Sequence, residues 1–181
     1  YNLFSFVPQT TWKHIVANEK VAVDGPLSAG EVIPCRSAGG GLDCPTGADA
    51  PVKSMLIGGV GTSGRELFAF ELSQFPNNVL REREANINRW PDQAMMWSLT
   101  RNQESDLGFT VSRPALAHVA INGQVRGVAV VGCGLDVNDD LSYAENHGGV
   151  GRCVLFVDAS TGQVLKKVEG PDSPQGFRYP V

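Results

Sequence analysis

An internal repeat organises the sequence, and this repeat limits the folds that the chain can adopt. Four stretches of a first unit correspond in order to four stretches of a second unit. The corresponding stretches are residues 23–29 (VDGPLSA) and 111–117 (VSRPALA), 56–58 (LIG) and 130–132 (VVG), 64–71 (GRELFAFE) and 151–158 (GRCVLFVD), and 95–99 and 164–168. Each unit therefore contains four predicted strands, and a repeated unit of this kind is typical of a stacked architecture.

Alternating apolar and polar residues, separated by turn residues, predict three hairpins along the chain. The paired stretches are residues 54–60 with 66–72, 116–121 with 125–132, and 153–157 with 163–168. Asn122 and Gly123 tolerate positive φ, which suits a type I′ turn in the second hairpin. Helical spacing occurs only in residues 10–18, so one short helix is expected near the N-terminus.

Four antiparallel strands in each repeat are the pattern of a propeller blade. We expect an all-β fold, with residues 1–181 forming a fragment of a single β-propeller domain. The predicted blades cover about residues 21–100 and 111–169, and residues 1–8 and 177–181 are expected to be edge strands of adjacent blades. Two blades do not close a ring, so the remaining blades of a parent protein are expected partners. A β-sandwich is the alternative fold, but the repeat favours a propeller.

Composition excludes several classes of protein. Apolar runs stay below the roughly 18 residues that a membrane span requires, so no membrane span is predicted. Lys and Arg number 15 and Asp and Glu number 19, which gives a net charge of −4, and neither sign is clustered. Nucleic-acid binding is therefore not expected. The chain begins at Tyr1 and ends in a strand-like stretch, so we expect it to be a piece of a longer protein.

The four cysteines form two local pairs. Cys35 and Cys44 bracket one glycine-rich stretch, and Cys133 and Cys153 bracket another. An even number of cysteines in local pairs favours two disulfides and an oxidising compartment. Four reduced, buried thiols are the alternative. Cys133 ends one predicted strand and Cys153 begins its neighbour, so a bond between them would close the base of a long loop.

Strand order predicts which loops share an end of the fold. In a blade of four strands, the loops after the first and third strands lie at one end, which holds residues 35–44 and 75–92. The loop after the second strand, residues 133–153, lies at the opposite end together with residues 101–106.

An acidic loop in the second unit has partial calcium-ligand spacing. Asp136, Asn138 and Asp140 alternate in the sequence, as oxygen ligands do in calcium loops. Ser142 could add its carbonyl and Glu145 a carboxylate, so calcium is the one candidate cofactor. Glycine and glutamate are missing from the places where an EF-hand requires them. A solvated acidic loop with Asx turns is the alternative.

Several other residues have both a functional and a structural interpretation. Trp90 precedes a proline in a polar stretch and is the candidate for an exposed contact, although an anchoring role is the alternative. Trp97 is expected to pack between blades, and His118 is expected to be a packed or rim residue. Residues 58–64 are rich in glycine but lack the Lys-Ser/Thr ending of a P-loop, which favours a wide turn. No serine lies in a Gly-x-Ser-x-Gly elbow.

Several of these motifs together resemble a known family. Residues 56–70 (LIGGVGTSGRELFAF), Trp97, residues 106–109 (DLGF) and residues 155–162 (LFVDASTG) follow the order seen in the C-terminal β-propeller of PilC/PilY-type proteins. The resemblance covers nearly the whole chain. One departure is that residues 132–135 (GCGL) stand where relatives carry Gly-Asn-Gly-Tyr.

The resemblance implies a protein of type IV pili without enzyme activity. Its implied roles are pilus assembly, control of retraction, and adhesion from the pilus tip. The implied location is extracellular, at the pilus tip or outer cell surface, after export through the periplasm. Implied partners are minor pilins or the pilus fibre and a host or abiotic surface ligand. The alternatives are a propeller enzyme of the quinoprotein dehydrogenase type, because residues 158–162 (DASTG) resemble a turn in those blades, and a purely structural scaffold.

Overall fold

The computed structural model describes residues 8, 16–17, 23–33, 52–72, 94–121, 124–134 and 150–170. The predicted edge strand at residues 177–181 lies outside these residues. So do the predicted edge strand at residues 1–8, apart from the buried Pro8, and the predicted helix at residues 10–18, apart from two exposed residues.

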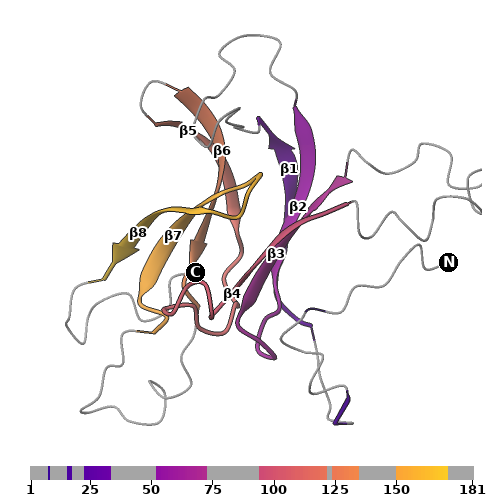
Figure 1. Ribbon diagram of the computed structural model, residues 1–181, viewed down its shortest axis with the longest axis vertical. Helices are drawn as coiled ribbons and strands as arrows, with labels where there is room; N and C mark the ends of the chain where they lie inside the picture. The colour runs from indigo at the N-terminus through magenta and orange to yellow at the C-terminus, as the bar shows by residue number, and fades with distance from the viewer. Residues whose placement is uncertain are drawn as a thin grey trace, which may run out of the picture.

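In the part of the chain that the structure describes, eight strands form two antiparallel sheets of four strands each, joined in simple chain order (Figure 1). The first sheet contains β1 (Leu27–Val32), β2 (Lys53–Gly59), β3 (Glu66–Glu71) and β4 (Met95–Thr100). The second sheet contains β5 (Ala115–Ile121), β6 (Gln124–Gly132), β7 (Cys153–Asp158) and β8 (Val164–Glu169). The all-β prediction is confirmed, and each of these strands overlaps a predicted one.

Strand pairing shows that the two sheets repeat each other residue by residue. A register shift falls between Ala69 and Phe70 in the first sheet and between Phe156 and Val157 in the second. When the two sheets are aligned at these register shifts, the strand pairings match Trp97 with Lys166 and Gly59 with Gly132.

The sequence correspondence is wrong by one residue in the first two strands of each unit. It aligned Gly58 with Gly132 and Leu27 with Ala115, whereas the pairings align Gly59 with Gly132 and Ser28 with Ala115. The correspondence followed matching glycines and prolines, but the connections between strands differ in length. Because side chains alternate between the faces of a sheet, a slip of one residue would exchange the two faces.

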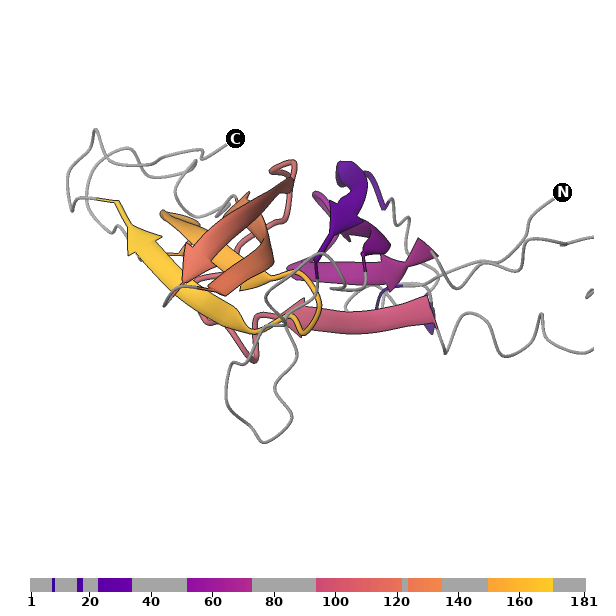
Figure 2. The same ribbon diagram turned by 90° about the horizontal axis from the view of Figure 1, so that it is seen from above.

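The main core lies between the two sheets, which Figure 2 shows standing side by side. The first sheet contributes Ile57, Leu67 and Trp97, and the second contributes Val131 and Leu155. Burial of this apolar surface is the main force that holds one sheet against the other. The prediction that Trp97 packs between blades is therefore confirmed.

Trp97 fits against the turn between β7 and β8. Its indole Nε1–H donates a hydrogen bond to the carbonyl of Ala159 (2.8 Å). Gly162 has a φ of +76°, and a Cβ there would lie 2.7 Å from the indole ring. Asp158 shapes the turn, because its Oδ1 accepts bonds from the Ser160 backbone N–H (2.9 Å) and hydroxyl (2.7 Å). Glycine at 162 thus allows both the turn and the contact with the indole ring.

A second contact joins the sheets at the end of β1. The Gly127 N–H donates to the Ile33 carbonyl (2.9 Å), and the Ile33 N–H donates to His118 Nε2 (3.1 Å). A Cβ at Gly127 would lie 2.7 Å from Val32 Cβ, so the strands approach closely only because this residue is glycine. His118 is exposed and holds the junction, as expected for a rim residue.

Within the described residues, the structure contains no helix with the length and apolar character needed to cross a lipid bilayer.

Candidate binding face beside the disulfide

Residues 101–114 connect β4 to β5 and pass between the two sheets; we call them the connecting segment. The segment starts with a turn in which the Glu104 N–H donates to the Thr100 carbonyl (3.1 Å). Gln103 Oε1 accepts bonds from the Thr100 N–H (2.8 Å) and hydroxyl (2.9 Å). Leu107 is fully buried in the core between the sheets. The segment is therefore held by its own turn and by an apolar anchor.

A disulfide joins Cys133 at the end of β6 to Cys153 at the start of β7, with their Cα atoms 5.1 Å apart. The connecting segment docks on this bond. The Gly108 N–H donates to the Cys133 carbonyl (2.7 Å), and the Gly151 N–H donates to the Asp106 carbonyl (2.8 Å). Both cysteines are buried. The bond thus fixes the surface on which the connecting segment rests, and the predicted Cys133–Cys153 pairing is confirmed.

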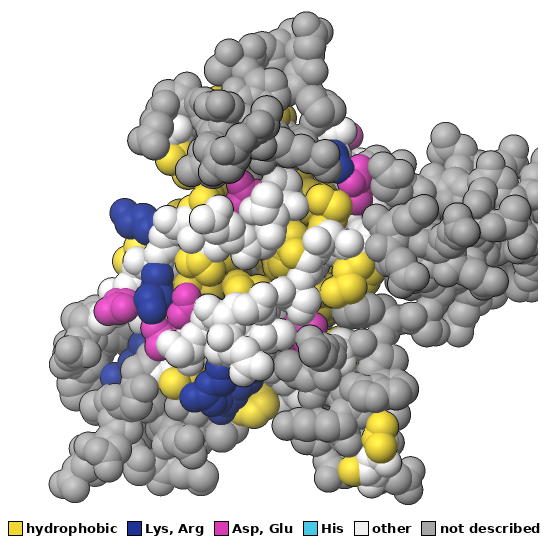
Figure 3. Space-filling model, in the orientation of Figure 1, with side chains coloured by type: hydrophobic (Ala, Val, Ile, Leu, Met, Phe, Trp, Pro, Cys, Tyr) yellow, Lys and Arg dark blue, Asp and Glu magenta, His cyan; other side chains and the backbone are white. Residues whose placement is uncertain are grey.

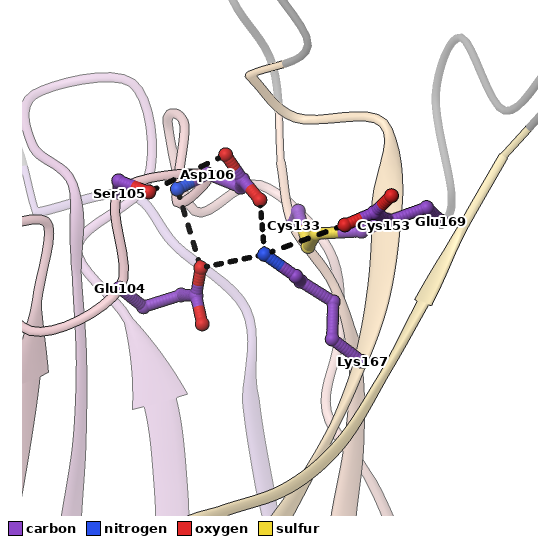
Figure 4. Close-up of a disulfide and its surroundings, with 7 residues drawn as sticks. All are labelled: Glu104, Ser105, Asp106, Cys133, Cys153, Lys167 and Glu169. Carbon is purple, nitrogen blue, oxygen red and sulfur yellow. Dashed lines mark hydrogen bonds and ion pairs between the residues drawn. A yellow bond between two sulfur atoms is a disulfide. The ribbon is translucent and has the colours of Figure 1, made fainter. Parts of the chain in front are cut away.

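A charged cluster lies over the disulfide (Figure 4). The Lys167 ammonium on β8 pairs with Asp106, with Glu104 Oε1 (3.4 Å) and with Glu169 Oε1 (3.6 Å). The hydrogen bond that the Lys167 ammonium donates to Asp106 is the largest cause that raises the pKa of Lys167 above its ordinary value, and the charges of Glu104 and Asp106 add to it. One ammonium faces three carboxylates, so the cluster keeps net negative charge.

The segment before β1 packs against the turn between β2 and β3, next to the connecting segment. Asp24 Oδ1 accepts a bond from the Thr62 N–H (2.8 Å), and Oδ2 accepts one from the Thr62 hydroxyl (2.8 Å). Thr110 of the connecting segment forms a bridge with Gly61, and its hydroxyl donates to the Glu66 carbonyl (3.0 Å). Residues 58–64 thus form the end of β2 and the turn into β3, as the sequence predicts.

These contacts define a candidate binding face: the connecting segment, the disulfide, the Lys167 cluster and the Asp24–Thr62 turn. Figure 3 shows basic and acidic side chains next to each other at the left margin, over β8, beside an apolar centre. Among the described residues, no group of three His, Cys, Asp or Glu side chains is arranged to hold a metal ion. The chemistry of this face, with paired charges over a rigid base, suits recognition of another protein surface.

The remaining predicted site residues lie outside the described residues. They are Cys35, Cys44, Trp90, Asp136, Asn138, Asp140, Ser142 and Glu145. Sequence reasoning missed the cluster of Glu104, Asp106 and Lys167. The signal available was strand order, which placed residues 101–106 at the end that holds Cys133 and Cys153. The face of β8 on which Lys167 lies could not be assigned without the register shift that leaves Leu165 as an extra residue in β8.

Replacing Lys167 with methionine is expected to lower the free energy of unfolding by about 1 kcal/mol, because partly exposed ion pairs contribute little each. The raised pKa gives the sign of the pH dependence. This stabilisation is present below about pH 10, the ordinary range for lysine, and is lost as the pH rises further. Urea unfolding of the wild type and variant at pH 7 and pH 11 tests this. A difference that grows at pH 11 would contradict the role of Lys167.

Acid is expected to weaken the turn that joins Asp24 to Thr62. Hydrogen bonds from the Thr62 backbone and hydroxyl lower the pKa of Asp24 below 3.8. The carboxylate therefore stabilises the fold above that pH, and this contribution is lost as the pH falls through the lower folded-state pKa. Amide exchange of Thr62, measured by NMR from pH 6 to pH 2, should show falling protection at the acid end. In Asp24→Asn, protection at pH 6 should already be reduced.

Comparisons with known proteins show that the sequence of this chain is similar to type IV pilus biogenesis factors. No protein-family model matches it. It is 28% identical over 125 residues to the type IV pilus biogenesis factor PilY1 homolog of Xylella fastidiosa, covering 68% of this chain and 7% of that protein. It is 29% identical over 121 residues to the type IV pilus biogenesis factor PilY1 of Pseudomonas aeruginosa, covering 67% of this chain and 8% of that protein.

The fold has a solved counterpart. The crystal structure of the Pseudomonas aeruginosa PilY1 C-terminal domain matches 96% of this chain and 27% of that chain, with a TM-score of 0.59 and 18% sequence identity. The two all-β structures share a β-propeller-like fold. The resemblance to PilC/PilY-type proteins is thus confirmed: the curated homologues are PilY1 type IV pilus biogenesis factors.

Proposed function

We propose that this chain is part of the C-terminal β-propeller of a PilY1-like pilus biogenesis factor and acts without catalysis. Its roles are pilus assembly, control of pilus retraction and adhesion to surfaces. The observation that carries this proposal is the pair of sheets with one repeated register, packed in series through Trp97 and matched to a PilY1 domain over most of the chain. The chain spans 7–8% of the curated relatives, so the whole protein's roles belong to this proposal.

The proposed location is outside the cytoplasm, at the pilus tip or the outer cell surface, after export through the periplasm. The Cys133–Cys153 bond supports an oxidising compartment. The proposed partners are minor pilins or the pilus fibre, the remaining blades of the parent protein, and a host or abiotic surface ligand. The candidate binding face supports protein contacts, because its charges are held over a rigid disulfide base.

Two predicted features outside the described residues stay part of the proposal. Trp90 is a candidate contact with a partner. Asp136, Asn138, Asp140, Ser142 and Glu145 are candidate calcium ligands, for which the spacing is the support. Calorimetry of the folded parent protein with millimolar calcium tests this site. Absence of binding heat from the wild type, or equal heat from the wild type and an Asp136→Asn/Asp140→Asn variant, would remove it.

Complementation tests the proposed function. In a bacterium that makes this protein, deletion of the parent gene is expected to abolish surface pili and surface attachment, and the wild-type gene should restore both. In a strain that cannot retract pili, the same deletion separates the two pilus roles: recovered pili indicate retraction control, and absent pili indicate assembly. Unchanged piliation in the first strain would contradict the proposal.

The alternatives have their own readouts. A quinoprotein enzyme would carry a cofactor visible in the absorbance of the purified parent protein and would oxidise an alcohol. A pure scaffold would support piliation but would not retain minor pilins in a pull-down. Charge reversal at exposed Arg113 on the connecting segment, compared with charge reversal at exposed Glu31 on β1, outside the candidate binding face, asks whether this face contributes to that retention.

A further inference from the structure

The second sheet has one side that faces away from the first sheet, which we call the far face. Its residues occupy the positions that correspond to those by which the first sheet contacts the second. In the first sheet, Leu67 and Trp97 point toward the second sheet and enter the core between them. The pairings align these two residues with Val154 and Lys166. Directly paired residues lie on one side of a sheet and alternate along each strand. The positions by which the first sheet contacts the second sheet thus occur again in the second sheet, on its far face.

The alternation of side chains along each strand identifies the residues of the far face. Leu155 and Val157 lie in the core between the sheets, so Val154 and Phe156 lie on the opposite side. Their pairing partners continue that side across the sheet. The far face includes Ala115, Ala117, Val119, Arg126, Val128, Val130, Gly132, Val154, Phe156, Asp158, Lys166 and Val168. None of its members belongs to either core cluster of the described residues.

The chemistry of the far face is that of an interface. Most of its members are apolar, and its members on β6, β7 and β8 other than Lys166 are half-buried or buried. They include the charged residues Arg126 and Asp158, both of which are buried. Lys166 is exposed at the place where Trp97 stands in the first sheet. Trp97 uses that place to donate a hydrogen bond to a carbonyl in the turn of the next sheet. An ammonium is also a donor, so the substitution keeps the polarity of the contact while adding charge.

We infer that a further four-stranded sheet of the parent protein docks on the far face, and that Lys166 donates to an oxygen acceptor in the turn between its last two strands. Continuity with the interface built on Trp97 carries this inference, which rests on the proposed placement of the chain in a larger propeller. The acceptor is a backbone carbonyl, as at Ala159, or a carboxylate, which would also match the charge of Lys166.

Chemical footprinting of the folded parent protein tests the two parts separately. Phe156, probed by hydroxyl radicals, reports whether a sheet covers the far face. Lys166, probed by an amine-acylating reagent, reports whether its ammonium is engaged. The reference is a lysine introduced at exposed Asn102 (Asn102→Lys). We expect Lys166 to react at least ten-fold more slowly than Lys at 102, and Phe156 to be protected relative to the urea-unfolded protein.

The outcomes distinguish the inference from the proposed function. Protected Phe156 with a fully reactive Lys166 would keep the propeller placement and overturn the role of Lys166. Reactivity of both would overturn the docking itself, whatever the piliation assays show. When Lys166 is protected, a carbodiimide identifies its acceptor: an amide crosslink from Lys166 to an acidic residue assigns a carboxylate, and no crosslink assigns a carbonyl.

Variants provide an independent measurement. Lys166→Glu places an anion against the acceptor and should lower the unfolding temperature of the parent protein, whereas Lys166→Trp restores the donor seen in the first sheet and should be tolerated. Arg101→Glu is the matched control, because it makes the same charge change at an exposed turn. Equal effects of Lys166→Glu and Arg101→Glu would contradict the inference.

Discussion

Replacing both Cys133 and Cys153 with alanine is expected to lower the free energy of unfolding by about 3 kcal/mol, because the disulfide closes a loop over a sequence separation of 20 residues. The connecting segment should loosen as well, since Gly108 donates to the Cys133 carbonyl. Urea unfolding of the oxidised wild type and variant measures the first effect. Amide exchange at Gly108 measures the second.

Reduction provides the control for this prediction. A dithiol reductant should destabilise the wild type by a similar amount and leave the Cys133→Ala/Cys153→Ala variant unchanged. A Cys35→Ala/Cys44→Ala variant separates this effect from any contribution of the other two cysteines, and it should keep its sensitivity to the reductant. Equal unfolding midpoints for the oxidised wild type and the Cys133→Ala/Cys153→Ala variant would show that the bond does not stabilise the fold.

The Trp97→Ala variant is expected to lose about 3–5 kcal/mol of stability, the range for truncation of a large buried aromatic side chain. Trp97 is 8% exposed and lies between the sheets, so its removal leaves a cavity at their junction. Trp97→Phe keeps most of the packing but leaves the Ala159 carbonyl without its donor, for a loss of about 1–2 kcal/mol. Thermal unfolding of the three proteins gives the order of stability.

Gly162 supplies a double-mutant test of the same contact. Gly162→Ala should destabilise the protein, because its Cβ would lie 2.7 Å from the indole ring and its φ is +76°. In a Trp97→Ala background the contacts with the indole ring disappear, while the contact with the Cβ of residue 97 (3.0 Å) and the backbone strain remain. The two single losses should therefore sum to more than the loss of the double variant. Strictly additive losses would mean that Trp97 and Gly162 do not contact each other in solution.

Much of the fold follows from short-range patterns. The three hairpins and the place of Trp97 between the sheets were predictable, because alternation and turn chemistry act over a few residues. The Cys133–Cys153 pairing was predictable too, because strand order brings the two strand ends together. These features required no knowledge of how connections of different length shift one strand against another.

Register and charge pairing were not predictable in the same way. The repeat matched Gly58 to Gly132, and the observed register differs by one residue, since bulges and loop lengths set the pairing. Lys167 pairs with Asp106 across a sequence separation of 61, and that contact depends on which face of β8 meets the connecting segment. Such a contact is a property of the assembled sheets, and no local pattern encodes it.

The bond between the neighbouring strand ends also has a mechanical consequence. Tension applied along the backbone bypasses the residues between Cys133 and Cys153, because the covalent link carries the load. A separation of 20 residues corresponds to about 65 Å of fully extended chain that a pull does not release. In a protein proposed to work on a fibre that extends and shortens, this part of the molecule would stay short under load while the bond remains oxidised.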